Sequence, residues 1–153
     1  MITLRAVFWL AVCQLPALIS TPFVDPNRAW YHTLVKPPLV PPDWLFGVMW
    51  GILYVLVGIA AVMVFYKGVT KAKRAAVGFL LIQLGLNACW TPVFFGLHFL
   101  PGALLVVLLM LGEGFFLHRV FAEQSKWAAR LLIPYWMWLG FATYLTAGYM
   151  MLN

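Results

Sequence analysis

The sequence predicts an all-α integral membrane protein, a bundle of five transmembrane helices with a structured first loop that acts as a lid. Of its 153 residues, 65% are hydrophobic and 9% are charged, whereas soluble domains average about 45–50% apolar and about 25% charged residues. The sparse charges also divide the chain into long apolar intervals, each close to the roughly 20 residues that a spanning helix needs. This composition excludes a soluble enzyme, a disordered chain and a disulfide-stapled secreted module.

The charge-free intervals place the helices. Residues 6–24 and 44–66 are each free of charge, and residues 75–112 form an interval too long for one span. Pro101 divides that interval, because proline suits the first turn of a helix, where its missing N–H needs no partner. The last helix begins near Trp127 at the membrane interface. We therefore expect one domain, residues 1–153, with spans at approximately 4–23, 44–66, 75–97, 101–121 and 127–151.

The first span has an alternative interpretation as a cleaved signal peptide. Arg5, the apolar stretch after it and the small residues near Ser20 fit such a peptide. However, Pro16 interrupts the stretch and no A-x-A site follows it. We therefore favour a retained helix.

The basic residues predict the orientation. Five spans place eight cations on the side of the N-terminus and only two, Arg28 and Lys36, on the other. Positive residues favour the cytoplasmic side, so we expect a cytoplasmic N-terminus and an external C-terminus. The isoelectric point near 9.6 reflects these loop cations, and we expect no nucleic-acid partner. The eight cations are Arg5, Lys67, Lys71, Lys73, Arg74, Arg119, Lys126 and Arg130.

The first loop, residues 25–43, is too apolar and too rich in proline for a flexible linker. Its two Pro-Pro pairs favour a stiff, extended backbone, and Asn27 can cap a short helical turn over residues 28–35. We expect this loop to fold over the helix ends as a lid. The alternative is an aromatic anchor at the headgroup level, formed by Trp30 and Tyr31.

Three of the predicted helices carry a face that combines large rings with an amide or a hydroxyl, at helical spacing. Such faces can enclose a flat, largely apolar ligand, and the polar groups would orient it. Alternatively, the rings pack the helices together and the amides bond between them. The faces are Phe46, Trp50 and Tyr54; Gln83, Asn87, Trp90 and Phe94; and Tyr135, Trp138, Ala142 and Thr146.

The remaining residues that could indicate a function are a carboxyl, the histidines, two glycines and the cysteines. Glu113 lies within a span, where a carboxyl is costly and is a candidate functional group. The histidines lack metal-ligand spacing, so we assign no metal site; His32 remains a minor candidate for axial ligation of a haem iron.

Gly47 and Gly51 permit close helix packing, within the chain or in a homodimer. Cys13 and Cys89 are interpreted as packing residues. No phosphate loop, nucleophile elbow or carboxylate pair indicates an ordinary enzyme.

Three segments of the chain combine aromatic, proline and amide residues at fixed spacings. The first is Trp30-Tyr31-x4-Lys36-Pro37-x3-Pro41-Pro42-x-Trp44-x-Phe46-x3-Trp50-x3-Tyr54. The second is Gln83-Leu84-x-Leu86-Asn87-x2-Trp90-Thr91-Pro92-Val93-Phe94-Phe95-Gly96. The third is Trp127 with Leu131-Leu132-Ile133-Pro134-Tyr135-x2-Trp138-x2-Phe141-Ala142. Together these segments strongly resemble the TspO/MBR family of tryptophan-rich sensory proteins.

This resemblance implies a five-helix bundle, commonly a homodimer, in a bacterial cell membrane, where lipid is a constant partner. It implies binding of protoporphyrin IX or haem as ligand, with no required cofactor, and of isoquinoline or benzodiazepine compounds. It also implies a role in tetrapyrrole-dependent regulation and stress responses. The pocket implied by the resemblance comprises Trp30, Tyr31, Pro41, Trp50, Tyr54, Asn87, Trp90, Phe94, Trp138, Ala142 and Thr146.

The chain departs from the family pattern in two places. Thr146 occupies a position where many members have asparagine. The cholesterol motif proposed for the translocator protein needs a basic residue after a tyrosine near the C-terminus, and none follows Tyr149. We therefore expect no cholesterol site of that kind.

Three functions follow as hypotheses. The preferred one is a tetrapyrrole-binding sensor, regulator or carrier. The second is light-dependent porphyrin degradation, in which Trp50 or Trp138 donates an electron to the excited macrocycle. The third is a small proton-coupled exporter that uses Glu113 as its titrating acid.

Overall fold

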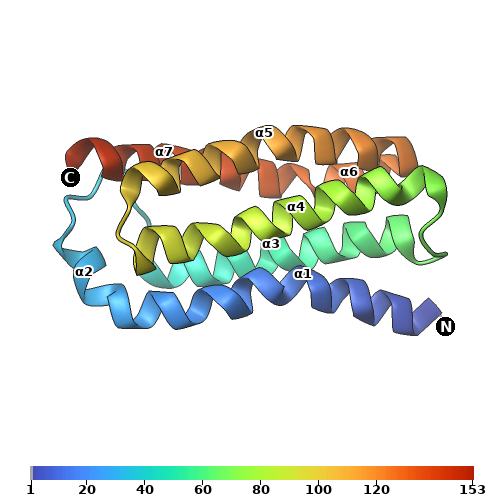
Figure 1. Cartoon of the computed structure of the whole chain (residues 1–153), viewed down its shortest axis with the longest axis horizontal. Helices are drawn as coiled ribbons and strands as arrows, with labels where there is room; N and C mark the ends of the chain where they lie inside the picture. Colours follow the sequence, from blue (N-terminus) through green and yellow to red (C-terminus); the bar gives the residue numbers. More distant parts are fainter. Residues whose placement is uncertain (1) are drawn as a thin grey trace.

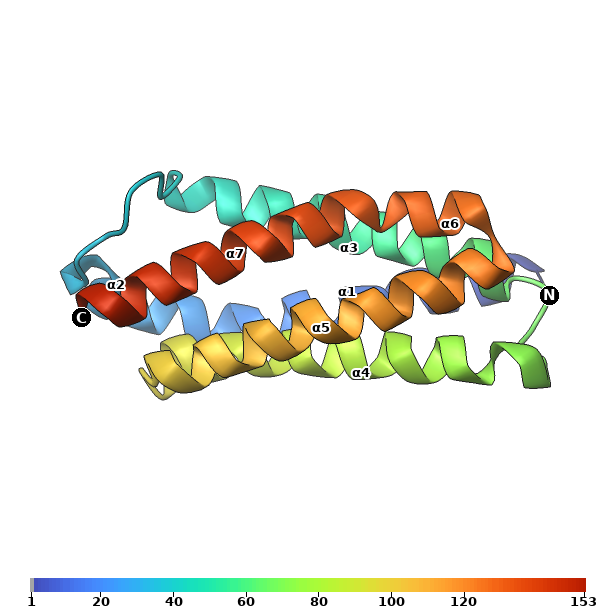
Figure 2. The same cartoon turned by 90° about the horizontal axis from the view of Figure 1, so that it is seen from above.

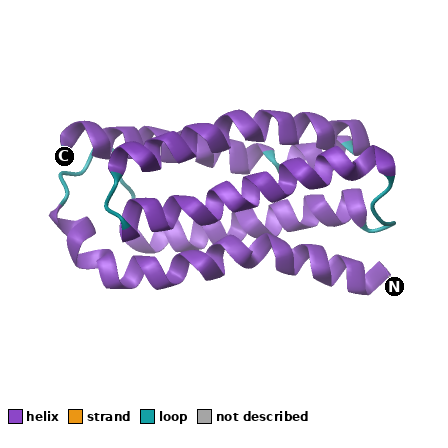
Figure 3. Ribbon diagram, viewed as in Figure 1, coloured by secondary structure: helices purple, strands orange, loops and turns teal. Residues whose placement is uncertain are grey.

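The chain is helical almost throughout (Figure 3). The computed structural model describes residues 2–153, and it contains no strand in that range. The helices are α1 (Ile2–Val24), α2 (Arg28–Thr33), α3 (Asp43–Phe65), α4 (Arg74–Thr91), α5 (Leu100–Gln124), α6 (Lys126–Leu131) and α7 (Ile133–Leu152). Short 3-10 turns at Asp25–Asn27 and Lys71–Lys73 and a wider turn at Pro92–Gly96 join or extend them.

The long helices lie side by side along one axis (Figure 1). Helix α1 packs on α3 and α4, α4 packs on α5, and α5 packs on α7. Viewed from above, α3 and α7 lie on one side of the bundle and α4 and α5 on the other (Figure 2). The N- and C-termini lie at opposite ends of the molecule, and α2 lies at the C-terminal end (Figure 1).

Four helical segments are long and apolar enough to cross a membrane: Leu4–Thr33, Asp43–Phe65, Lys71–Gly96 and Leu100–Gln124. Their outward faces carry large apolar side chains, such as Leu18 at 68% exposure and Leu105 at 59%. Soluble monomers rarely expose contiguous apolar surface of this kind, whereas lipid covers it. The protein is therefore an integral membrane protein.

The fifth expected span, residues 127–151, corresponds to α6 and α7. Helix α7 has 20 residues, the length of a span, but its many Trp and Tyr residues make it less hydropathic than the four segments above. The chain also breaks between α6 and α7 at Leu132, with Pro134 in the first turn of α7, a break that we did not predict. The predicted helix start at Pro101 is confirmed, since Pro101 lies in the first turn of α5.

The first loop is more helical than the sequence indicates. Helix α2 forms where a short turn was predicted, so only residues 34–42 lack helical structure. Asn27 occupies the N-cap position of α2, as predicted, but its side chain makes no capping hydrogen bond. Its Nδ2 donates to the carbonyl of Phe23 at 2.9 Å, and its Oδ1 lies 2.9 Å from His98 Nε2. These contacts attach α2 to α1 and to the turn before α5.

Packing differs between the two halves of the bundle. In the half near the N-terminus, buried side chains fill the space between helices: the rings of Trp9 and Phe65 lie 4.5 Å apart, and Phe121, Leu80 and Leu117 are almost fully buried. Close packing of this kind leaves little room for a ligand. The half near α2 and the C-terminus contains a cavity instead.

Candidate functional site

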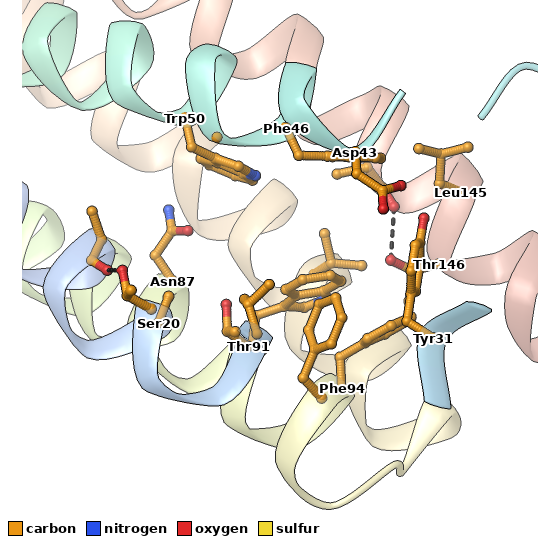
Figure 4. A pocket seen from close by; sticks show the side chains of 18 of the residues that line it. Ser20, Tyr31, Asp43, Phe46, Trp50, Asn87, Thr91, Phe94, Leu145 and Thr146 are labelled. Carbon is orange, nitrogen blue, oxygen red and sulfur yellow. Dashed lines mark hydrogen bonds between the residues drawn. The ribbon is translucent and has the colours of Figure 1, made fainter. Parts of the chain in front are cut away.

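The cavity has a volume of about 570 Å³, within the range of about 300–1,000 Å³ typical of small-molecule sites. It lies among α1, α3, α4, α5 and α7, with α2 at its outer end (Figure 4). Nine residues predicted for the site line it: Tyr31, Trp50, Tyr54, Asn87, Trp90, Phe94, Trp138, Ala142 and Thr146. The two remaining predicted residues, Trp30 and Pro41, are not part of the lining.

Two aromatic stacks form opposite walls. On α3, Trp50 stacks on Tyr54 with ring centroids 5.5 Å apart. On α4 and the turn after it, Trp90 stacks on Phe94 at 4.9 Å. Each pair is four residues apart, which places both rings on one helix face. Trp138 of α7 meets Trp50 edge to face at 6.5 Å, so these rings supply a wide apolar surface.

The inner end of the cavity is a buried hydrogen-bond network. Tyr54 Oη donates to Asn87 Oδ1 at 3.0 Å, and Asn87 Nδ2 donates to Tyr135 Oη at 2.5 Å. Gln83 Nε2 donates to the same Tyr135 oxygen at 2.6 Å. Both ends of the Asn87 amide are therefore occupied by protein groups. Its first role is to hold Tyr54 and Tyr135 in place.

The remaining polar groups of the cavity wall differ in the hydrogen bonds that they can still form. Thr146 Oγ1 donates to the Ala142 carbonyl at 2.8 Å. Its hydroxyl hydrogen is therefore bonded within α7, and only the oxygen lone pairs can accept a hydrogen bond from a ligand. The indole Nε1 atoms of Trp90 and Trp138 are buried and have no hydrogen-bond partner within residues 2–153. A buried donor without a partner is costly. Both rings line the cavity, but their Nε1 atoms lie within the wall, so an acceptor on a ligand reaches them only if the rings turn.

The segment from α2 to α3 closes the outer end against α7. Tyr31 Oη and Tyr149 Oη lie 2.7 Å apart (Figure 4). Val35 exchanges two hydrogen bonds with the Asn153 side chain, at 2.8 and 3.1 Å. Tyr144 Oη donates to the Pro38 carbonyl at 2.9 Å. These bonds hold loop 34–42 on the last three turns of α7.

Trp30 and His32 take other positions. Trp30 stacks on His98 with centroids 3.8 Å apart and supports the cavity wall from behind, against Phe94. His32 Nε2 lies 3.1 Å from the Asp43 carboxylate. Since His32 is not part of the cavity lining, its position does not fit axial ligation of a haem iron held there.

Several lining residues were not predicted from the sequence. Helix α1 contributes Ala17, Ser20, Thr21 and Val24. These residues have no aromatic or amide pattern that would mark them. Asp25 and Arg28 also line the cavity, and their side chains form a salt bridge with an N–O distance of 2.8 Å. Their position directly after the first predicted span could have marked them in the sequence as candidates for the site.

Glu113 lies outside the cavity lining. Both of its carboxyl oxygens are buried and lack a hydrogen-bond partner in the described chain. Its position does not place it on a ligand in the cavity.

Comparison with known proteins agrees with this architecture. The sequence model of the TspO/MBR family matches residues 8–152. The chain is 36% identical to Protein CrtK of Rhodobacter capsulatus, covering 99% of this chain and 94% of the relative. It is 38% identical to Tryptophan-rich protein TspO of Chlorobaculum tepidum, over 94% and 92%. It is also 38% identical to the human Translocator protein, over 74% and 69%. The helical membrane architecture, the aromatic cavity and these matches together establish that the chain belongs to the TspO/MBR family.

Proposed function

We propose that this protein binds a tetrapyrrole, protoporphyrin IX or a close analogue, and acts as a membrane sensor or regulator of porphyrin homeostasis and stress responses. The observation that carries the proposal is the cavity of about 570 Å³ with two aromatic stacks in its walls. A flat, largely apolar macrocycle gains from stacking and apolar burial. If the rings of Trp90 and Trp138 turn on binding, acceptors of the macrocycle would complete the hydrogen bonds of their buried Nε1 atoms. Flat isoquinoline or benzodiazepine compounds share this chemistry.

Loop 34–42 acts as a lid in this proposal. Its bonds to α7 join the loop backbone to the side chains of Asn153 and Tyr144, so they can break without disturbing the backbone hydrogen bonds of the helices. The lid faces the outside of a bacterial cell membrane, and α6–α7 form the fifth span. The name of the relative in Chlorobaculum tepidum, a tryptophan-rich protein, fits the eight tryptophans of this chain.

A titration with protoporphyrin IX in the dark tests the proposal, with Trp fluorescence quenching as the readout. Trp138→Phe keeps a ring but removes the indole donor. We expect the variant to bind about tenfold more weakly, because a hydrogen bond contributes about 0.5–1.5 kcal/mol and 1.4 kcal/mol is tenfold. Trp127→Phe is the matched control, because Trp127 is 67% exposed and packs on Arg130 away from the cavity.

Saturable quenching that the Trp138 variant weakens and the Trp127 variant leaves unchanged would support the proposal. Linear, non-saturating quenching that is equal in all three proteins would mean partitioning into micelles. It would refute the assigned ligand.

The proximity of Trp50 and Trp138 favours a second candidate, light-dependent porphyrin degradation. Both indoles line the cavity, where either can donate an electron to an excited macrocycle. Illumination of the loaded protein in air should then bleach the porphyrin absorbance. Trp50→Phe should slow the bleaching while dark binding persists, whereas equal bleaching in both proteins would exclude this role.

A further inference from the structure

The spacing between α1 and α3 changes along their length. Near the N-terminal end of the bundle the two helices touch. A β-carbon added to Gly58 would lie 3.0 Å from Leu10 Cδ2 and 3.6 Å from Cys13 Cβ. At Gly51 and Gly47 an added β-carbon would meet no described atom within 4 Å. The helices therefore separate toward the cavity end.

The register of the two helices shows what borders this gap. They run antiparallel and each rises about 1.5 Å per residue, so seven residues beyond the Cys13–Gly58 contact Ser20 faces Gly51. Eleven residues beyond it, Val24 faces Gly47. All four of these residues line the cavity. Figure 4 shows Ser20 on α1 across the cavity from Trp50 on α3. The gap is thus continuous with the ligand site.

Lipid-facing side chains flank the gap on both helices. Leu18 and Ile19 of α1 are 68% and 45% exposed, and Val48 and Ile52 of α3 are 48% and 51% exposed. These residues alternate with the small residues that line the gap. The opening therefore lies within the apolar surface of the protein, where lipid tails surround it.

The outer end of the cavity is closed more firmly than this gap. Access from water requires loop 34–42 to leave α7, which breaks the bonds of Val35 and Pro38 with α7. By contrast, the Thr21 hydroxyl at the edge of the gap donates to the Ala17 carbonyl of its own helix, so this bond does not hold α1 to α3. No hydrogen bond joins α1 to α3 at the gap within the described chain.

We propose that the gap between Ala17–Val24 of α1 and Gly47–Gly51 of α3 is a lateral portal. Through it, a planar apolar ligand dissolved in the bilayer reaches the cavity without opening the loop. This inference rests on the proposed function, and it assigns the ligand to the lipid-dissolved class. The two glycines keep the portal open, since any larger side chain on either would project into it.

A reversible cross-link tests the portal in lipid nanodiscs. In a Cys13→Ala, Cys89→Ala background, the pair Ser20→Cys and Gly51→Cys is bridged by a bis-maleimide with a reducible disulfide in its spacer, because the gap is too wide for a direct disulfide. The probe is protoporphyrin IX supplied in liposomes, with association followed by Trp quenching. We expect the cross-link to slow association about tenfold, within the range of one to three decades seen among mutants of one site, and reduction of the spacer to restore it.

Two matched pairs control for the cross-link itself. Leu10→Cys with Gly58→Cys joins the same helices at their closed end and should leave the association rate unchanged. Val35→Cys with Asn153→Cys ties the loop shut and should also leave it unchanged. If the loop cross-link blocks association and the cross-link at the gap does not, ligand enters from water and the proposal is wrong.

A second measurement is independent of porphyrin. Ala142→Cys places a thiol in the cavity wall, and a pyrene maleimide dissolved in the bilayer labels it through the portal. Gly51→Leu should slow this labelling about tenfold, again within one to three decades. Gly112→Leu, a helix glycine with equally open surroundings in the described chain, should not. Unchanged labelling in the Gly51 variant overturns the portal even if porphyrin binds.

The porphyrin-binding and labelling measurements distinguish failure of the proposed ligand from failure of the proposed portal. If the reduced protein shows no saturable porphyrin binding but the Gly51 variant slows labelling, the assigned ligand fails and the portal stands. If Gly51→Leu instead converts a dimer to a monomer and changes neither rate, a second copy of the chain covers the gap and the portal is refuted.

Discussion

At the scale of single residues, Asn87 connects the packing of the bundle to the shape of the site. It accepts from Tyr54 and donates to Tyr135, and Asn87 itself is 4% exposed. In an apolar interior each of these groups is costly without its partner. The network therefore sets the rotamers of two rings, one of which stacks on Trp50 in the cavity wall.

Replacing Asn87 should therefore destabilise the protein more than a surface asparagine would. Asn87→Leu leaves the buried Tyr54 hydroxyl without a partner, which costs about 1–3 kcal/mol. It also removes one of the two hydrogen bonds that Tyr135 Oη accepts, while the bond from Gln83 remains. We expect a loss of about 2–4 kcal/mol in the free energy of unfolding, measured by denaturation in detergent. The control is Asn27→Leu at the periphery, with a loss near 1 kcal/mol.

A double-mutant cycle checks the cause of that loss. Tyr54→Phe removes the hydroxyl that Asn87→Leu leaves without a partner, so Asn87→Leu should cost less in the Tyr54→Phe background. Equal losses in both backgrounds would show that the effect comes from Leu packing and not from the network.

At the scale of elements, the end of α7 and loop 34–42 form one closed unit. Gly148 lies where α7 meets the loop: an added β-carbon would lie 2.5 Å from Pro37 Cβ. No atom of a normal structure approaches that closely, so any side chain there must displace the loop. The loop backbone otherwise depends on Asn153 and Tyr144 for its bonds to the helix.

Two glycines of α7 give opposite predictions for alanine. Gly148→Ala should expose the amides of residues 34–42, seen as hydrogen exchange at least about tenfold faster, because local opening then costs about 1.4 kcal/mol less. Gly140→Ala has open space in the described chain and should stabilise the helix by about 1 kcal/mol. Unchanged exchange in the Gly148 variant would show that the loop is not held by this contact.

At the scale of the whole molecule, charge and length set how the bundle sits in the membrane. The loops at the N-terminal end carry Lys67, Lys71 and Lys73, and the loops at the other end carry Arg28 and Lys36. The termini lie at opposite ends of the bundle (Figure 1). This arrangement agrees with an odd number of crossings if α6–α7 also spans the bilayer.

Labelling of single cysteines in intact cells tests the topology. In a Cys13→Ala, Cys89→Ala background, Leu39→Cys and Asn153→Cys should react with an impermeant maleimide, and Val69→Cys should react only after lysis. The expected contrast comes from the positive-inside distribution. Protection of Asn153→Cys in intact cells, with Leu39→Cys still reactive, would mean four crossings and a cytoplasmic C-terminus.

Much of this protein follows from the sequence alone. The charge-free intervals determined the four long helices, because lipid permits few charges and requires every backbone group to be bonded within the segment. Helical spacing placed Trp50 and Tyr54, and Asn87 and Trp90, on shared faces, since the period of an α-helix is local geometry. The same spacing identified nine of the lining residues, three on each of α3, α4 with the turn after it, and α7, without knowledge of the packing.

Only the tertiary structure decided what those faces do. It bonded both ends of Asn87 to tyrosines from other helices, it left the indoles of Trp90 and Trp138 without partners, and it separated α1 from α3 beside Gly51. These outcomes depend on the distance and register between helices far apart in the chain. Side-chain spacing along one helix contains no information about that distance. The sequence therefore determined which surfaces are apolar and aromatic, and the packing of the helices decided where they enclose space.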